Sequence, residues 1–293
     1  MADITEIVQS VQQNYGIVGR SKELRQLVLA RVAGKHAVIE GPVGVGKTTL
    51  AHAIAAHFDQ GFIRIDGDER YTEAKLVGYF EPPLVVDKGW NWDTFVSGPL
   101  TLAMKNGSVL FINEANRLLE GTQNVLLPTL DEGILIIPKL GVVTGEKGFF
   151  VVATQNPESY IGTTVLSEAL RDRFVWVKLA HQDYEEELGI VLGKLKEAEG
   201  SGNSTQIGEI STKITRSTRR HPDIRRGASV RGAIDLAAIL AHVPRLELGS
   251  IIEAAIMALA TKVELEDGVD RPIEDIITEI VEKTLSGEDS PFL

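Results

Sequence analysis

The chain has 293 residues, of which 43% are apolar and 24% charged, and it carries a formal net charge of −11. It contains no cysteine, which excludes disulfide bonds, thiolate metal sites and cysteine nucleophiles. The acidic balance argues against a general electrostatic hold on nucleic acid, which would need a basic face. No apolar run approaches the ~18–20 residues that span a bilayer, and the N-terminus lacks a signal pattern, so we expect a cytoplasmic protein.

The first part of the chain is expected to be helical. Residues 1–14 and 21–34 have apolar side chains at helical spacing. A short apolar run, residues 37–39, then predicts a buried strand, and residues 49–56 predict a further helix. A glycine-rich turn therefore lies between a strand and a helix.

This turn is Gly41-Pro42-Val43-Gly44-Val45-Gly46-Lys47-Thr48, which fits the phosphate-loop pattern GxxxxGK[ST]. Glycines let successive backbone N–H groups point into one concavity, and the following helix adds its partial positive charge. The pattern therefore predicts a polyphosphate site. An ordinary glycine-rich turn that caps a helix is the alternative.

In this interpretation the loop binds ATP through residues 41–48 together with Thr49. Lys47 would reach the β- and γ-phosphates, and the Thr48 hydroxyl would ligate Mg²⁺. Ile17 and Val18 lie before the first strand, where an adenine ring can lie in such a protein. A plain packing role for these two side chains is an equally good explanation.

The region after the loop helix contains a predicted insertion. Residues 62–68 alternate like a second strand, and residues 71–77 predict a helix. Residues 78–98 predict a hairpin, with one strand at 84–86, a turn at 87–89 and a returning strand at 90–96. Trp90 and Trp92 would project from one face of the returning strand. They are either buried against the domain or presented to a partner or a pore.

Polar residues end two of the later predicted strands. Residues 108–112 form an apolar run typical of a central parallel strand, and Asn113 and Glu114 follow it. Residues 148–153 predict another strand, which Thr154 to Pro157 follow. Open α/β sheets bind ligands at the carboxyl ends of their strands. The remaining predicted elements of this part are a helix at 117–130 and strands at 134–137 and 174–179.

Residues from 181 onward change in character. Helical periodicity covers residues 185–200, 230–243, 250–263 and 273–285, and the sequence from Gly200 to Ser204 predicts a flexible break. We therefore predict an α/β domain with a parallel sheet over residues 1–180, with the hairpin insertion at about 78–98. An all-helical lid domain is predicted over residues 181–293.

The order of these motifs resembles the AAA+ ATPases of the MoxR type, relatives of the magnesium-chelatase ATPase subunit that carry a hairpin insertion in their second helix. The resemblance spans residues 17 to about 240. It rests on EGPVGVGKT (40–48), GPLTLAMKNGSVLFINEANR (98–117), ATQNP (153–157), SEALRDRF (167–174) and GASVRG (227–232).

The resemblance implies a role for five residues. Glu114 resembles the Walker B glutamate, which orients and deprotonates the attacking water. Asn156 resembles the sensor 1 amide, and Arg231 resembles sensor 2 at the head of a lid helix. Arg173 resembles the arginine finger that reaches into a neighbouring subunit, with Arg171 as the second choice.

Each role has a plainer alternative. Asn156 could form only a turn before a proline. Arg171 and Arg173 could pair with Glu168 and Asp172 on the surface. The basic stretch that includes Arg216, Arg219, Arg220, Arg225 and Arg226 could bind nucleic acid, but a solvated or inter-subunit loop is the preferred interpretation.

One position departs from the family pattern. The residue before the Walker B glutamate is usually aspartate, and here it is Asn113. Its amide oxygen can accept a hydrogen bond from a metal-bound water but brings no negative charge. We therefore expect ATP and Mg²⁺ to bind with weakened metal dependence, and hydrolysis to survive because Glu114 is present.

The resemblance implies an ATP-hydrolysing homo-oligomeric ring, a hexamer, because an arginine finger acts across a subunit interface. Such proteins remodel or activate client proteins, often with a von Willebrand A-type partner. Two rival functions are a hydrolysis-poor, nucleotide-dependent assembly switch and a nucleic-acid-associated AAA+ protein that uses residues 213–231. A kinase is disfavoured because residues 154–173 would have no role in it.

Overall fold

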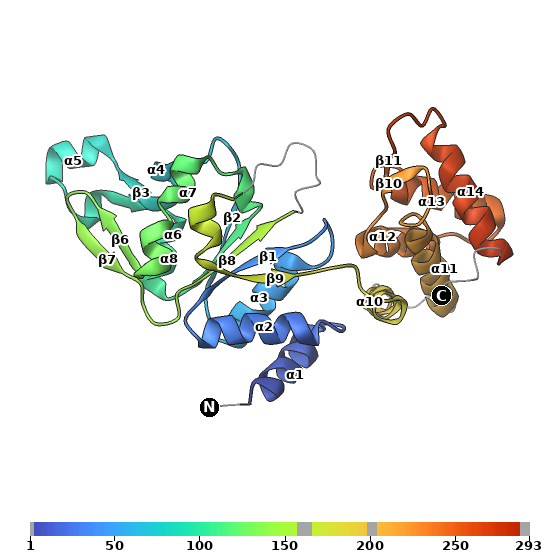
Figure 1. Cartoon of the computed structure of the whole chain (residues 1–293), viewed down its shortest axis with the longest axis horizontal. Helices are drawn as coiled ribbons and strands as arrows, with labels where there is room; N and C mark the ends of the chain where they lie inside the picture. The colour runs from blue at the N-terminus through green and yellow to red at the C-terminus, as the bar shows by residue number, and fades with distance from the viewer. Residues whose placement is uncertain (1–2, 157–165, 198–203, 288–293) are drawn as a thin grey trace. The chain divides into compact units, whose positions relative to one another are not determined.

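The structure of the chain, a computed structural model, describes residues 3–156, 166–197 and 204–287 (Figure 1). The chain divides into two compact units. The first unit comprises residues 1–42 and 46–179, and the second comprises residues 43–45 and 180–293. Each unit has a hydrophobic core of its own.

A five-stranded parallel sheet forms the centre of the first unit (Figure 1). In spatial order its strands are β2 (Phe62–Asp66), β5 (Val109–Asn113), β8 (Phe150–Gln155), β1 (His36–Glu40) and β9 (Phe174–Lys178). The central strands β5 and β8 are almost wholly buried, as expected of apolar parallel strands that are covered on both faces. Because all neighbours are parallel, the carboxyl ends of β1, β5 and β8 meet at one edge. The predicted α/β fold is confirmed.

Helices cover both faces of this sheet (Figure 1). Helices α2 (Ser21–Val32), α3 (Lys47–His57) and α6 (Pro99–Asn106) contact its strands. Helices α4 (Glu73–Val77) and α9 (Glu168–Arg171) contribute side chains to the same core, and α1 (Ile4–Tyr15) packs on α2 and α3. Leu110 and Ile112 of β5 pack in one core with Leu100 and Met104 of α6. Helix α6 begins with Pro99, at a position where no backbone N–H is needed for a helical hydrogen bond. Gly107, whose φ is 61°, caps its C-terminal end.

The insertion differs from the predicted hairpin. Two short antiparallel strands, β3 (Gly78–Phe80) and β4 (Phe95–Ser97), close it, but helix α5 (Pro82–Lys88) and the 3₁₀ turn η1 (Trp92–Thr94) lie between them. The predicted strand at 84–86 is wrong, because the two prolines occupy the first helical positions and favour a helix start. The β-branched residues that indicated a strand are thus part of a helix.

The two tryptophans of the insertion precede β4 instead of lying on it. Trp90 is 55% exposed and contacts Phe80 edge to face, with ring centroids 4.7 Å apart. Trp92 is 40% exposed and contacts Phe95 in the same manner, at 5.7 Å. The Nζ atom of Lys105 lies 4.1 Å from the centroid of the Trp92 ring. Both side chains therefore pack on one side and face solvent on the other.

The continuous helix predicted over 117–130 is also wrong. The segment forms η2 (Ala115–Arg117), α7 (Glu120–Asn124) and α8 (Leu127–Asp131). Pro128 lacks the N–H that a continuous helix would use at this point. An antiparallel hairpin of β6 (Ile134–Ile137) and β7 (Gly141–Thr144) follows, and β7 lies where only a connection was expected.

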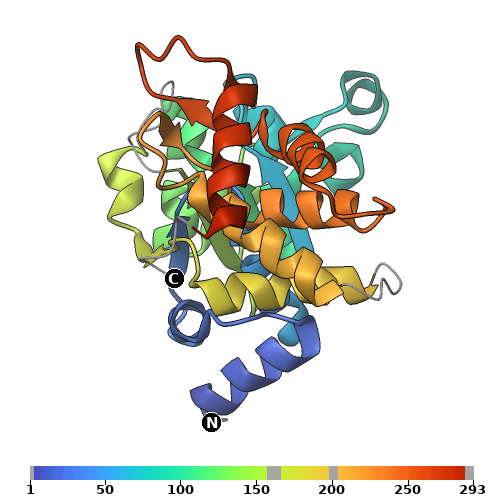
Figure 2. The same ribbon diagram turned by 90° about the vertical axis from the view of Figure 1, so that its right-hand side faces the viewer.

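The described residues of the second unit are mostly helical and include two short strands. Its helices are α10 (Tyr184–Glu197), α11 (Ser204–Ser217), α12 (Val230–Leu240), α13 (Leu248–Leu259) and α14 (Ile273–Ser286), which Figure 2 turns toward the viewer. Strands β10 (Ile224–Arg226) and β11 (Glu264–Leu265) pair in antiparallel fashion. Of the break predicted from Gly200 to Ser204, residues 200–203 lie outside the described residues, and Ser204 is the first residue of α11. None of the helices in the described ranges has both the length and the apolar character needed to cross a membrane.

Candidate nucleotide-binding site

The predicted phosphate loop joins β1 to α3 at the edge of the sheet where the carboxyl ends of the strands lie. Gly44 and Gly46 have φ values of 80° and 93°, a region in which side chains are strained. Gly41 has no room for a side chain, because a Cβ atom would lie 2.5 Å from the carbonyl oxygen of Leu179. Glycine is therefore required at these three positions for the shape of the loop. This shape fits the cradle expected for a polyphosphate.

The Lys47 ammonium group lies inside this loop, and the residue is only 9% exposed. Its Nζ atom donates to the carbonyl oxygens of Gly41 and Pro42, at 2.5 and 3.0 Å, and to Oδ1 of Asn156 at 2.9 Å. Burial lowers the pKa of the Lys47 ammonium to about 8, an effect that the charge of Glu114 partly offsets. A buried cation that donates to three neutral oxygens among the described residues is well suited to receive an anion.

Glu114 follows β5 and lies near the same group. Its Oε1 atom accepts a hydrogen bond from Nδ2 of Asn156 at 3.3 Å, and its Oε2 atom lies 2.9 Å from Nη1 of Arg117. The backbone N–H of Glu114 donates to Oγ1 of Thr154 at 2.9 Å, and its φ is 51°. The structure thus brings together Lys47, Asn156 and Glu114, three of the residues that the sequence singled out.

Asn113, the last residue of β5, is held by both neighbouring strands. Its Oδ1 atom accepts a hydrogen bond from the Thr154 hydroxyl at 3.2 Å, and its Nδ2 atom donates to Oδ1 of Asp66 at 2.8 Å. Asp66 also contacts Arg64, whose Nη2 atom lies 2.6 Å from the same oxygen. The Arg64 guanidinium and the Asn113 amide hold the pKa of the Asp66 carboxyl below its usual range.

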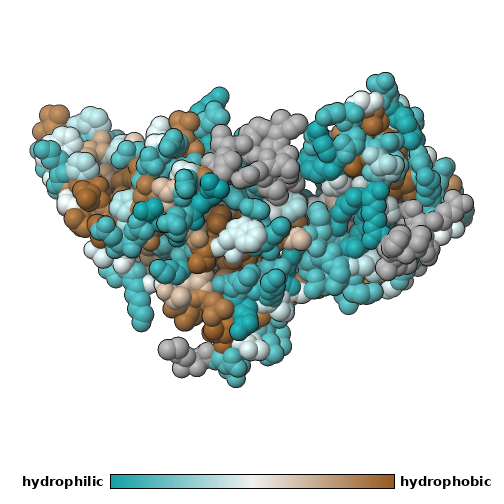
Figure 3. All heavy atoms as spheres, viewed as in Figure 1, coloured by the Kyte–Doolittle hydropathy of each residue, from teal (hydrophilic) through white to brown (hydrophobic). Residues whose placement is uncertain are grey.

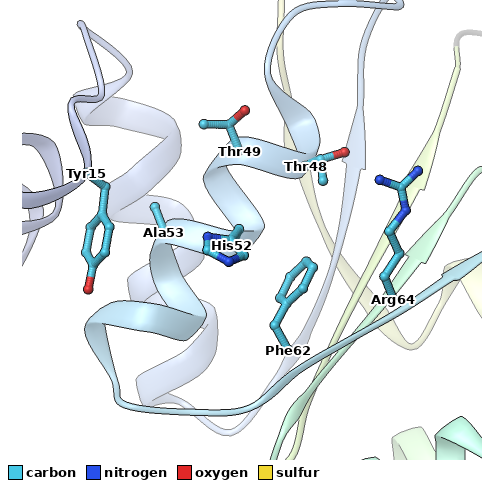
Figure 4. Close-up of a pocket in the computed structure, with 7 residues that line it drawn as sticks. All are labelled: Tyr15, Thr48, Thr49, His52, Ala53, Phe62 and Arg64. Atoms are coloured by element: carbon cyan, nitrogen blue, oxygen red, sulfur yellow. The ribbon is translucent and has the colours of Figure 1, made fainter. Parts of the chain in front are cut away.

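A cavity of about 460 Å³ lies beside the start of α3. Figure 4 shows the guanidinium of Arg64 directed toward the first turn of this helix, where Thr48 and Thr49 lie. Tyr15, His52, Ala53 and Phe62 complete the lining. Thr48 and Thr49 are therefore accessible from this side. Ile17 and Val18 lie half-buried between α1 and α2, and their proposed contact with adenine stays a prediction.

The predicted arginine finger has a partner within its own chain. Arg173 donates to Oδ2 of Asp131 and to the carbonyl oxygen of Ala169, both at 2.6 Å. The ion-pair partner of Arg173 is thus Asp131, and not Glu168 or Asp172 as the sequence suggested. Arg171 lies at the exposed end of α9. The action of either arginine in a neighbouring site stays a prediction.

The basic stretch of the second unit is paired within that unit. Arg216 and Arg219 share the buried carboxylate of Glu187, at 2.9 and 2.8 Å. Arg225 and Arg226 both contact Glu264. Such pairing leaves less positive charge for nucleic acid than the sequence indicated. Arg231 lies in the first turn of α12, and its proposed contact with a γ-phosphate stays a prediction.

Sequence reasoning missed Asp66, Thr154 and Asp131 as members of these contacts. A usable signal existed for Asp66, because it ends a parallel strand just as Asn113 does. The two residues are register partners on adjacent strands. The ion pair between Asp131 and Arg173 spans 42 positions and no sequence pattern announces it.

A parallel sheet of this order, with a phosphate loop after β1 and polar side chains after β5 and β8, has the fold of the AAA+ nucleotide-binding proteins. Two solved structures share it with TM-scores of 0.53. A Cytophaga hutchinsonii protein is 22% identical, and the match covers 96% of this chain and 94% of that one. A mutant of RuvB from Thermotoga maritima is 20% identical, with 82% and 70% covered.

The sequence comparisons agree with this fold. The model of the AAA domain, dynein-related subfamily, matches residues 36–174. Gas vesicle ATPase GvpN of Haloferax mediterranei is 30% identical in an alignment of 264 residues that covers 82% of this chain and 74% of that protein. The chain therefore belongs to the AAA+ family, and its match to the dynein-related subfamily covers residues 36–174.

Proposed function

We propose that the chain is a MoxR-type ATPase that hydrolyses ATP with Mg²⁺. The observation that carries this proposal is the contact of Asn156 with both Lys47 and Glu114. One amide thereby connects the group suited to bind phosphate with the carboxylate suited to act on water. An ordinary glycine-rich turn needs no such arrangement.

In the proposed reaction the side chains have separate tasks. Lys47 donates from Nζ to phosphate oxygens in place of the loop carbonyls. Glu114 accepts a proton at Oε1 from the attacking water, which Nδ2 of Asn156 orients. As the water oxygen bonds to the terminal phosphorus atom, the bond from that atom to the bridging oxygen breaks, so that ADP and phosphate leave. The Thr48 hydroxyl would hold Mg²⁺, which when bound offsets the negative charge of the phosphates.

Steady-state phosphate release tests this function. Glu114→Gln should lower kcat about 100-fold or more and keep ATP affinity within a few-fold, because a glutamine cannot accept the proton. Lys47→Ala should abolish ATP binding. Glu120→Gln, which removes an exposed carboxylate of α7, is the matched control and should behave like the parent chain. Equal turnover in Glu114→Gln and the parent would refute the proposal.

A second candidate function is a nucleotide-dependent assembly switch with little hydrolysis. It is favoured by the contact of Arg117 with Glu114, because this ion pair engages one oxygen of the carboxylate that would have to act on water. The same assay distinguishes the two functions. A switch would bind ATP and assemble, yet release phosphate no faster than its Glu114→Gln variant.

The proposed enzyme works as a homo-oligomeric ring, a hexamer, in the cytoplasm, with Arg173 acting across the interface. Client proteins and a von Willebrand A-type partner are proposed by family analogy. Client contact is proposed at the end of the first unit that carries α5 and the β6–β7 hairpin, where apolar side chains gather (Figure 3). Exposed apolar residues there are Tyr79, Val86, Ile136 and Val142. The paired basic stretch makes nucleic acid a weaker candidate.

A further inference from the structure

Asp66 and Asn113 end adjacent parallel strands and face each other in register. The Asn113 amide is committed on both sides, since its oxygen accepts from Thr154 and its nitrogen donates to Asp66. The oxygen that would accept a hydrogen bond from a metal-bound water therefore already accepts one from Thr154 and, as a neutral amide oxygen, offers no full charge. The nearest negative charge on this strand pair is the Asp66 carboxylate.

The residue types at the two strand ends are complementary. An aspartate at position 113 would place a second carboxylate against an Asp66 oxygen, where a hydrogen-bond donor now lies 2.8 Å away. Two carboxylates at such a distance do not both stay ionised. With one acid and one amide, the two strand ends carry a single full negative charge. This charge lies at the end of β2 and not at the end of β5.

Arg64 contacts Asp66 and lines the cavity beside the start of α3. Its Nη2 atom lies 2.6 Å from Oδ1 of Asp66, and its guanidinium lines the same cavity as Thr48 (Figure 4). Both side chains of this ion pair are exposed, at 47% for Arg64 and 58% for Asp66. Exposed pairs contribute only about 0–1 kcal/mol, so a divalent cation could compete with the guanidinium for this carboxylate.

We propose that Asp66 supplies the carboxylate that holds the water shell of Mg²⁺ in the nucleotide site, that Asn113 positions it, and that Arg64 competes with the metal. The inference rests on the proposed ATPase function. Thr48 and Asp66 offer the hard oxygen donors that Mg²⁺ prefers. It differs from the expectation that Asn113 itself accepts a hydrogen bond from a metal-bound water and that the metal dependence is weakened.

The test measures binding, without turnover. The dissociation constant of a non-hydrolysable fluorescent ATP analogue is determined with Mg²⁺ and with EDTA, and the ratio of the two constants reports what the metal contributes. Asp66→Asn should reduce this ratio at least tenfold, and Arg64→Ala should raise it. Glu69→Gln removes an exposed carboxylate three positions after Asp66. It is the control for the general electrostatic effect of losing one negative charge. Its ratio should equal that of the parent.

Exchanging the residue types at positions 66 and 113 controls for a loss of folding in Asp66→Asn. The double variant Asp66→Asn with Asn113→Asp keeps one carboxylate and one amide in contact and should restore most of the ratio. A parent ratio retained by Asp66→Asn, with the analogue still bound in a Lys47-dependent manner, would overturn the inference alone. An analogue that does not bind the parent chain at all would overturn the proposed function as well.

Discussion

The Nζ atom of Lys47 lies 2.9 Å from Oδ1 of Asn156, a residue 109 positions further along the chain. The contact joins the first residue of α3 to the residue that follows β8. Asn156 uses its other amide atom on Glu114. A single short side chain therefore fixes the separation of a cation and a carboxylate.

Replacement of Asn156 should separate binding from hydrolysis. Asn156→Ala leaves Lys47 its two carbonyl partners, so ATP affinity should change less than about tenfold, whereas loss of one oriented donor should lower kcat about 100-fold. Phosphate release and ATP titration measure the two effects. Asn124→Ala, on the exposed side of α7, serves as the control. Unchanged kcat in Asn156→Ala would exclude the proposed role.

Burial of Lys47 should make stability depend on pH. Its pKa is lowered from 10.5 to about 8 in the folded chain. Between these values the unfolded chain binds more protons, so the folded state gains stability as pH rises. Relative to Lys47→Met, the free energy of unfolding of the parent should rise by about 3 kcal/mol across this window. Urea unfolding at pH 7.5 and 10.5 measures the difference between the two chains.

Bound phosphate should restore the proton to Lys47. An anion beside the ammonium raises its pKa, so nucleotide binding near pH 9 should take up a proton. Calorimetry in two buffers of different ionisation enthalpy detects this uptake. The lowered pKa of Lys47 would be contradicted if the parent and Lys47→Met differed in free energy of unfolding by the same amount at pH 7.5 and 10.5. Nucleotide binding without proton uptake would contradict it as well.

Arg173 should complete the site of a neighbouring subunit. Its pair with Asp131 is partly exposed, at 26% and 44%, and so is weak enough to be exchanged for a phosphate contact. Arg173→Ala and Glu114→Gln should each be inactive, and a mixture of the two should regain activity, since each supplies what the other lacks. Arg171→Ala is the comparison. An inactive mixture that forms mixed oligomers would exclude action across the interface.

Gly67 should be sensitive to the smallest side chain. A Cβ atom there would lie 2.1 Å from the carbonyl oxygen of Glu114. Gly67→Ala should therefore cost about 1–3 kcal/mol of stability and lower kcat by moving Glu114. Gly121→Ala in α7, where no atom lies within 4 Å, should be neutral or slightly stabilising. Thermal unfolding and phosphate release measure both variants, and equal results for the two would refute this packing argument.

The sequence could predict those parts of the fold that depend on local pattern. The apolar runs at 37–39 and 108–112 became buried strands because parallel strands are covered on both faces. The phosphate loop was visible because its glycines are required for its backbone. The insertion was not predictable in this way, since β-branched residues after two prolines favour a strand by propensity and a helix by position.

The contacts around the candidate site were predictable only in part. Lys47 was found from the phosphate-loop pattern, and Glu114 and Asn156 were found because each follows a strand and has a recognisable neighbour sequence. The link from Asn113 to Asp66 depends on which strands are adjacent, and β2 and β5 are separated by 42 residues of chain. Strand order is a property of the whole sheet, and a local pattern does not contain it.

The left-handed backbone at Glu114 has a cost for the protein as a whole. A residue with a side chain is strained by about 1–2 kcal/mol at this φ, and glycine would relieve it. A variant with glycine here would hold its shape better but would lose the carboxylate proposed to do the chemistry. The variant with the higher folding stability is therefore not expected to be an active enzyme.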